Sequence, residues 1–175
     1  FGGVFKDLPP DSERIIKEFI KYERKKLDEY NELLTYNAIF LARSKGIGIL
    51  TKEAAIDYSV TGPMLRASGF KWDLRKEEPY LVYDKFDFDV PIGKVGDSWD
   101  RFKVRLEEMR QSLRIVEQAI GAIPEGNPVA KINKFYRPAA GEAYLRTENP
   151  RGELGFYIVS DGSDKPYRLK IRAPS

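Results

Sequence analysis

The stretch "DSWDRFKVRLEEMRQSLRIVEQAIG", residues 97–121, decides the fold more than any other part of the sequence. Large apolar side chains recur along it in steps of three and four residues, at Trp99, Phe102, Leu106, Met109, Leu113, Val116 and Ile120. This spacing predicts a helix with one apolar seam, which Asp97 or Ser98 caps and Gly121 ends. A seam of this kind packs lengthwise against another helix.

The simplest partner is a second long helix, from Asp11 to Leu34, packed antiparallel to the first. Its apolar residues also recur at helical spacing, with basic and acidic residues between them. Asp11 is expected to be its N-cap, and Glu13 lies in the first turn, where a negative charge suits the helix dipole. An intermolecular coiled coil is the alternative, but the seam covers only about two and a half heptads, which favours a pair within one chain.

Shorter elements are expected between the two long helices. One helix should cover Ala38–Arg43 and stop at Gly46, and another should begin after Thr51, which is placed to cap it. Residues 61–96 carry Gly or Pro every few positions, which predicts a long ordered loop with short pieces of strand. The loop is rich in aromatic residues, so we expect it to be pinned to a surface.

The last third of the chain predicts a different kind of structure. Residues 122–141 form an irregular connection, and alternating patterns predict three antiparallel strands at 142–148, 153–160 and 167–172. The fold class is therefore α+β and mainly α, divided into a helical segment (1–121), the connection (122–141) and a β segment (142–175).

Composition excludes several classes of function. The 175 residues carry a formal net charge of +3, too small to indicate nucleic acid as a partner, and no apolar run is long enough to span a membrane. There is no Cys and no His, which removes thiolate and imidazole ligands for metals and the commonest neutral-pH base. This argues against a self-contained active site, and no metal site or catalytic residue is predicted.

Basic side chains supply the candidate sites near the end of the chain. Arg168, Lys170 and Arg172 should share one face of the last strand, where they could line a groove for an anionic ligand or an acidic partner. The alternative, a solvated strand face, is the simpler interpretation. Arg151 differs, because Pro150 restricts the backbone before it and Gly152 relaxes the backbone after it. Such a step can hold a guanidinium in a defined pose.

Two further stretches carry charges between turn signals. Arg66 in "GPMLRASG" is expected to form a structural fork to carbonyl or carboxylate oxygens. The stretch "WDLRKEEPY" (72–80) holds Asp73, Arg75, Glu77 and Glu78, whose charges should neutralise each other at the surface. No phosphate loop, dinucleotide fingerprint or nucleic-acid fold signature is found.

Four stretches together resemble a known family: "FGGVFKDLPP" (1–10), "TGPMLRASGFKWDLRKEEPY" (61–80), "FDFDVPIGKVGDSWDRFKVRLEEMRQSL" (86–113) and "PRGELGFYIVSDGSDKPYRLKIRAPS" (150–175). They look like the middle and later portion of the D subunit of respiratory complex I, which is related to the large subunit of [NiFe] hydrogenases. The resemblance covers nearly the whole chain. It implies further sequence before "GGV" and after "RAPS", including the family's quinone-binding His and Tyr.

The resemblance also implies a function. The chain would be part of the quinone-chamber subunit of a proton-translocating NADH:quinone oxidoreductase, peripheral on the cytoplasmic face of the plasma membrane. Its partners would be three other subunits of the complex, namely the iron–sulfur B subunit, the C subunit and the membrane H subunit, together with quinone. The segment would bind no cofactor itself, would be inactive alone, and would receive electrons from an iron–sulfur cluster in its neighbour.

The Pro150-Arg151-Gly152 step matches the place where hydrogenase relatives hold an Arg over their metal pocket. The resemblance therefore implies that Arg151 lies near the quinone chamber or the terminal cluster, while Arg66, Arg168, Lys170 and Arg172 serve structure or docking. One alternative is a large-subunit fragment of a membrane-bound [NiFe] hydrogenase or of a deazaflavin-linked dehydrogenase. A second is a stand-alone module that binds an anion or an acidic partner with steep salt dependence.

Overall fold

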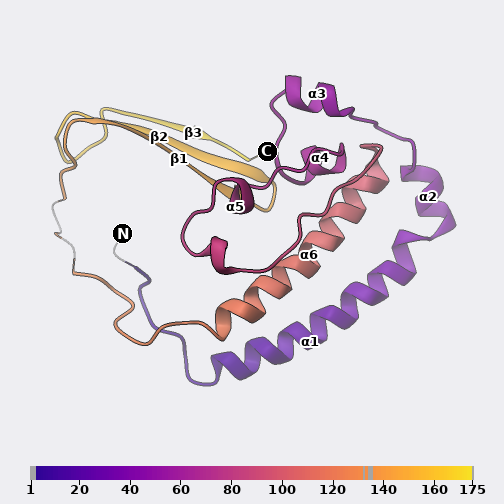
Figure 1. Ribbon diagram of the computed structural model, residues 1–175, viewed down its shortest axis with the longest axis horizontal. Helices are drawn as coiled ribbons and strands as arrows, with labels where there is room; N and C mark the ends of the chain where they lie inside the picture. The colour runs from indigo at the N-terminus through magenta and orange to yellow at the C-terminus, as the bar shows by residue number, and fades with distance from the viewer. Residues whose placement is uncertain (1–2, 132, 134–135, 175) are drawn as a thin grey trace.

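Two long helices, α1 (Ser12–Tyr30) and α6 (Ser98–Ile120), lie side by side along one edge of the molecule (Figure 1). The structure is a computed structural model that describes residues 3–131, 133 and 136–174. The helices run antiparallel, as predicted, and a buried apolar cluster joins them, formed by Ile20, Leu27, Leu106 and Leu113. The ion pairs Arg24–Glu117 and Arg110–Asp28 bridge the same two helices, and their numbering confirms the antiparallel direction.

The apolar seam predicted for α6 accounts for only part of the surface that this helix buries. Met109 and Val116, two members of that seam, are exposed, whereas Val104 and Ile115 are buried outside it. On this other side, α6 meets α4 (Gly62–Ala67) and the segment 87–89, which Arg114 and two glutamines bind. A helix placed between two layers needs two apolar faces, and the three-and-four spacing of the largest residues reveals only one of them.

The helix caps follow the sequence at two of three places. Asp97 accepts a hydrogen bond from the backbone N–H of Asp100, and Thr51 accepts one from Ala54 at the start of α3 (Lys52–Asp57). Asp11 occupies the predicted N-cap position of α1, but its side chain makes no capping hydrogen bond and its φ is 66°. Helix α1 continues into a π-helical turn, η1 (Asn31–Thr35), and α2 (Ala38–Ser44) ends before Gly46, close to its predicted bounds.

Residues 61–96 contain short helical pieces where short strands were expected. These are α4, α5 (Leu74–Glu77) and the 3-10 turn η2 (Tyr83–Lys85), and none of the described residues in this range belongs to a strand. The prediction of strands is therefore wrong. In α4 the deciding residue is Pro63, because proline is compatible with the first turn of a helix although it also marks loops.

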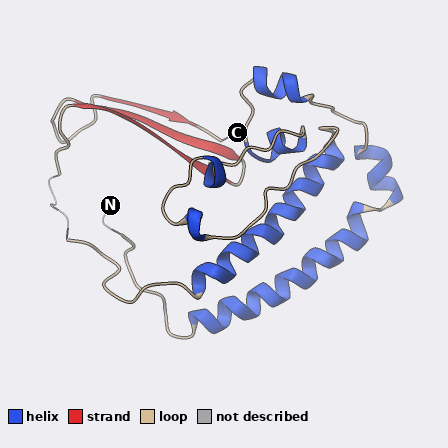
Figure 2. Ribbon diagram, viewed as in Figure 1, coloured by secondary structure: helices blue, strands red, loops and turns tan. Residues whose placement is uncertain are grey.

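The sheet consists of β1 (Gly141–Asn149), β2 (Gly152–Ser160) and β3 (Arg168–Arg172), antiparallel in the order β1-β2-β3. Each strand begins or ends within one residue of its prediction. Figure 2 shows that the sheet meets the helices at one end only, where the β1–β2 turn lies beside α4 and α5. The α+β, mainly α class is confirmed.

The connection from 121 to 140 has no regular element among its described residues, apart from an isolated bridge between Gly3 and Val129. Some predictions fall outside the described residues: the first two positions of the irregular opening segment, positions 132 and 134–135 of the connection, and position 175 of the β segment.

Candidate functional site

The candidate site is built around the turn that joins β1 to β2. Asn149 pairs with Gly152 in the register of the hairpin, which leaves Pro150 and Arg151 as the two turn residues. The side-chain oxygen of Asn149 accepts a hydrogen bond from the backbone N–H of Arg151, at 3.4 Å. Proline fixes one backbone angle of the turn, and this local hydrogen bond restrains the next residue.

A second backbone segment, at the start of α4, packs directly against the turn. A Cβ atom at Gly62 would lie 2.4 Å from the Cα of Gly152, and a Cβ at Gly152 would lie 2.6 Å from the Oγ1 of Thr61. Both glycines also have positive φ angles, 66° and 137°. Two backbones can approach this closely only where neither carries a side chain, so glycine is required on both sides of the contact.

Hydrogen bonds complete the contact between the two segments. Thr61 Oγ1 accepts from the backbone N–H of Glu153 at 3.0 Å, and Arg172 donates to the carbonyl oxygens of Glu153, at 2.7 Å, and Ser59, at 3.0 Å. The buried Glu153 carboxylate accepts hydrogen bonds from Tyr144 and Arg146. The turn is thereby attached to α4, to the preceding segment and to its own sheet.

These contacts correct the expectation of one continuous basic face on β3. Arg172 is occupied by carbonyl oxygens and by Glu153, so it holds the sheet to the helical part and offers no free charge. Arg168 and Lys170 are exposed and lie farther along the strand, opposite Val159 and Tyr157. The three cations therefore do not act as one surface.

The Arg151 side chain differs from the other arginines at this end of the hairpin. It is exposed, and among the described residues no carboxylate lies within ion-pair distance of it. A fixed backbone thus carries an unneutralised guanidinium, which can donate several hydrogen bonds to an oxygen-rich or negatively charged group.

Arg66 is almost fully buried on the other side of α4, at 1% exposure. Its Nε donates to Glu108 at 2.6 Å, and its Nη1 donates to Glu148 and to the carbonyl of Trp72, both at 2.8 Å. These are the carboxylate and carbonyl contacts expected of a structural fork. The arginine joins α4, α6, β1 and the segment before α5, and so it holds the hairpin in place.

Asp73 and Arg75 complete this group, which we call the Arg66 cluster: Arg66, Asp73, Arg75, Glu108 and Glu148. Arg75 binds Asp73 through two side-chain hydrogen bonds, at 2.9 and 2.7 Å. Asp73 is 2% exposed, so the expectation that the charges of residues 72–80 cancel at the surface is wrong for this pair. The carboxylate of this bidentate pair is buried, and the Arg75 side chain is 17% exposed.

The carboxyl groups of the Arg66 cluster respond differently to burial. Burial raises the pKa of Glu108 and of Glu148 above the usual range, and the positive charge of Arg66 offsets this only in part. Burial also acts to raise the pKa of Asp73. The hydrogen bonds and charge of Arg75, together with the charge of Arg66, outweigh burial, so the pKa of Asp73 is lowered. Sequence reasoning missed both Glu108 and Glu148, because no local motif links two carboxylates that are 40 residues apart.

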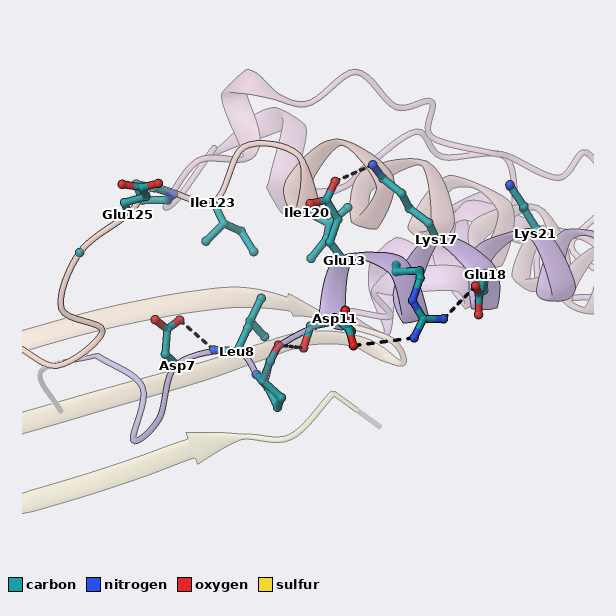
Figure 3. Close-up of a pocket in the computed structure, with 15 residues that line it drawn as sticks. Asp7, Leu8, Asp11, Glu13, Lys17, Glu18, Lys21, Ile120, Ile123 and Glu125 are labelled. Atoms are coloured by element: carbon teal, nitrogen blue, oxygen red, sulfur yellow. Dashed lines mark hydrogen bonds and ion pairs between the residues drawn. The ribbon is translucent and has the colours of Figure 1, made fainter.

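A cavity lies elsewhere, between the segment before α1, the first turns of α1 and the residues that follow α6 (Figure 3). Its volume is about 810 Å³ and its lining mixes acidic, basic and apolar residues. Its charges pair locally: Arg14 forms ion pairs with Asp11 and Glu18. Lys17 forms an ion pair with Glu13, which Figure 3 shows. The cavity has no concentration of one charge that would define a ligand.

Neither a metal centre nor a membrane span is found in the part of the chain that the structure describes. Its residues contain no group of three or more acidic side chains, histidines or cysteines arranged to hold a metal ion. Within the same residues, no helix combines the length and the apolar character that crossing a membrane requires.

Comparison with known proteins gives the family. The model of the family described as "Respiratory-chain NADH dehydrogenase, 49 Kd subunit" matches residues 1–138 and 129–175. The chain belongs to this family. The resemblance noted in the sequence is therefore confirmed, and it extends over the parts of the chain that build the β1–β2 turn and the Arg66 cluster.

Similar members of this family have closely related sequences. The chain is 54% identical over 183 residues to a D subunit of the NADH-quinone oxidoreductase of Roseiflexus sp. (strain RS-1), covering 100% of this chain and 49% of that protein. It is 52% identical over 175 residues to the D subunit of the NADH-quinone oxidoreductase of Bacillus anthracis, covering 99% and 48%. The chain spans about half the length of these relatives.

A solved structure shares the same backbone. A chain of the membrane-bound sulfane sulfur reductase, an archaeal respiratory membrane complex, superposes with a TM-score of 0.92 at 39% identity, covering 99% of this chain and 48% of that chain. The arrangement of helices and sheet described here is therefore also found in a respiratory membrane complex that is named for sulfane sulfur, whereas the relatives above are named for NADH and quinone.

Proposed function

We propose that this chain is part of the quinone-chamber subunit of a proton-translocating NADH:quinone oxidoreductase. The observation that carries the proposal is the identity of about half of all residues, over practically the whole chain, to proteins named as the D subunit of NADH-quinone oxidoreductase. In this role the chain passes electrons from an iron–sulfur cluster of a neighbouring subunit to quinone. It is peripheral, on the cytoplasmic face of the membrane.

The open shape of the molecule supports a role within an assembly. Its accessible surface is 12583 Å² at 20.1 kDa. A compact monomer of that mass exposes about 8,700 Å² by the usual scaling with molecular mass. One face of the sheet leaves a set of apolar side chains uncovered: Leu145, Phe156, Ile158, Leu169 and Ile171. Surfaces of this kind are normally covered by other polypeptide, for which we propose the B, C and H subunits and the rest of the same subunit.

The absence of Cys and His limits what this chain contributes to electron transfer. It offers no thiolate or imidazole to ligate an iron–sulfur cluster, so the cluster is assigned to the neighbour. What the chain does offer is Arg151, held on a fixed turn with its charge unneutralised. A guanidinium beside the chamber would stabilise a more negative, reduced quinone and would donate hydrogen bonds to its oxygens.

A second candidate substrate comes from the structural relative. Because the sulfane sulfur reductase shares the backbone at 39% identity, the fold alone supports sulfur reduction as well as quinone reduction. The higher identity to the quinone-linked proteins favours quinone. Assays of the intact complex with quinone and with polysulfide as separate acceptors would decide between the two. Hydrogenase and deazaflavin-linked activities rank lower, since none of the relatives described above bears such a name.

The test of Arg151 uses the intact complex. Arg151→Met should lower quinone reduction by at least tenfold while the complex still assembles, because methionine keeps an unbranched apolar side chain and removes the guanidinium with its charge. Arg14→Met is the matched control, since Arg14 is an exposed arginine on α1 that pairs with Glu18. Unchanged quinone reduction in Arg151→Met would remove Arg151 from the site.

A further inference from the structure

The Arg66 cluster contains more negative than positive groups. Three carboxyl groups, those of Asp73, Glu108 and Glu148, face two guanidinium groups, those of Arg66 and Arg75. The side chains of Arg66, Asp73 and Glu148 are 2%, 2% and 5% exposed, and those of Glu108 and Arg75 are 15% and 17% exposed. With every group ionised, a buried cluster would therefore carry one uncompensated negative charge.

The excess charge falls on the two glutamates. Arg75 donates hydrogen bonds to both carboxylate oxygens of Asp73, so the charges of these two residues compensate each other. Arg66 then remains as the cation for both Glu108 and Glu148, with one hydrogen bond to each, while Asp73 lies farther away, at 3.7 Å. One guanidinium cannot neutralise two carboxylates.

Neighbouring groups do not supply the missing positive charge. On β1, Arg146 is engaged with Glu78 and Glu153. On the segment after α5, Tyr80 exchanges hydrogen bonds with the backbone of Glu148, and Tyr83 contacts Arg75. On α6, Arg105 is exposed and donates to the carbonyl of Arg101 and to the sulfur of Met64. The remaining basic groups around the cluster thus have other partners.

We infer that Glu108 and Glu148 form a proton-binding site, which holds one proton between them at neutral pH. Two carboxylates that are held by one guanidinium in a poorly solvated cluster resist ionising together, because the second negative charge has no cation of its own. Binding of the proton makes one glutamic acid neutral, and Arg66 then forms a balanced ion pair with the other. Burial acts on the pKa of both glutamates in the upward direction, which is the direction that this arrangement requires.

The position of the site indicates how the proton would exchange with solvent and which part of the structure its release would affect. Glu108 is the less buried of the pair, so exchange with solvent would pass through it. Glu148 stands at the end of β1, directly before the Asn149–Gly152 turn that carries Arg151. Release of the proton would weaken the contact between Arg66 and one glutamate, and thereby loosen the hold on that turn. The proton site does not depend on the identity of the electron acceptor.

The test uses the full-length protein that contains this chain, and two isosteric variants of it, Glu108→Gln and Glu148→Gln. Infrared spectra at pH 7 should show the C=O stretching band of one protonated carboxyl group in the unmodified chain. Either substitution removes the excess charge, so each single variant should lose the band. The matched control is Glu107→Gln, at the neighbouring position of α6, where the carboxylate pairs with Arg110 outside the cluster. This variant should keep the band.

Proton release on unfolding gives a second, independent readout. Denaturing the unmodified chain at pH 7 in weak buffer should release one proton more than denaturing either cluster variant, whereas Glu107→Gln should match the unmodified chain. Absence of the band in the unmodified chain would overturn the inference. So would its survival in either cluster variant, because the proton would then reflect burial of one residue and not the shared excess of charge.

Discussion

The α1–α6 helix pair and the Arg66 cluster both hold distant parts of this chain together, but they do so by opposite means. In the helix pair, four aliphatic side chains, Ile20, Leu27, Leu106 and Leu113, bury apolar surface, and partial repacking can compensate for a small change in any of them. In the Arg66 cluster, one guanidinium serves four elements, and no neighbour can replace it. The cluster is therefore the more fragile of the two regions.

The sharpest way to test that contrast is Arg66→Met. The substitution removes the guanidinium that binds both Glu108 and Glu148. Loss of one partner from a buried ion pair typically lowers the free energy of unfolding by about 3–5 kcal/mol. Urea denaturation at pH 7 should show this loss, and part of it should return at pH 5, where the glutamates can be protonated. Arg105→Met, at an exposed position on α6, should change stability by less than about 0.5 kcal/mol. A similar small change for Arg66→Met would contradict the account.

The corresponding change in the helix pair is Leu27→Ala. Leu27 is 0% exposed, and truncation of a buried leucine should lower the free energy of unfolding by about 3 kcal/mol. This loss should not vary between pH 5 and pH 8, which separates it from the loss in Arg66→Met. Leu33→Ala is the control, since Leu33 is exposed in η1. If Leu27→Ala proved as tolerable as Leu33→Ala, the apolar cluster would not be what joins the helices.

The smallest expected effect concerns Asp100, whose carboxylate accepts hydrogen bonds from the backbone N–H groups of Lys94, Val95 and Gly96. Burial acts to raise its pKa, but these three hydrogen bonds lower it overall. Its contribution to stability is therefore present above the unfolded pKa of about 3.9 and is lost as the pH falls through the folded pKa. Asp100→Asn should lower stability at pH 7 by about 1–2 kcal/mol and should flatten the acid limb of the curve.

The contribution of Glu108 and Glu148 to stability depends on pH in the opposite direction. Because their folded pKa is raised, their contribution is complete below the unfolded pKa of about 4.3 and is lost as the pH rises through the folded value. Chemical denaturation of the unmodified chain, Asp100→Asn and Glu148→Gln at a series of pH values would separate the two limbs. An Asp100→Asn curve that was unchanged below pH 5, relative to the unmodified chain, would show that the hydrogen bonds of Asp100 do not govern the acid limb.

Local patterns were reliable where one element alone decides the outcome. Several features could be predicted: the strands, the two long helices, the caps at Thr51 and Asp97, and the contacts of Arg66 with carboxylate and carbonyl oxygens. The helix at Gly62–Ala67 was missed because its Gly and Pro are also the commonest loop residues. The second buried face of α6 was missed because the partners of that face come from other parts of the chain.

The candidate site also combines features that the sequence predicts with features that depend on the tertiary structure. The sequence by itself determined that a Pro-Arg-Gly step would present an arginine on a constrained turn, because backbone restrictions at Pro150 and Gly152 are properties of those residues. Only the tertiary structure decided that Arg172 is occupied, that Arg151 is not, and that Glu108 and Glu148 share Arg66. Charge balance in a buried place depends on which groups the fold brings within a few ångströms, and spacing along the chain does not contain that information.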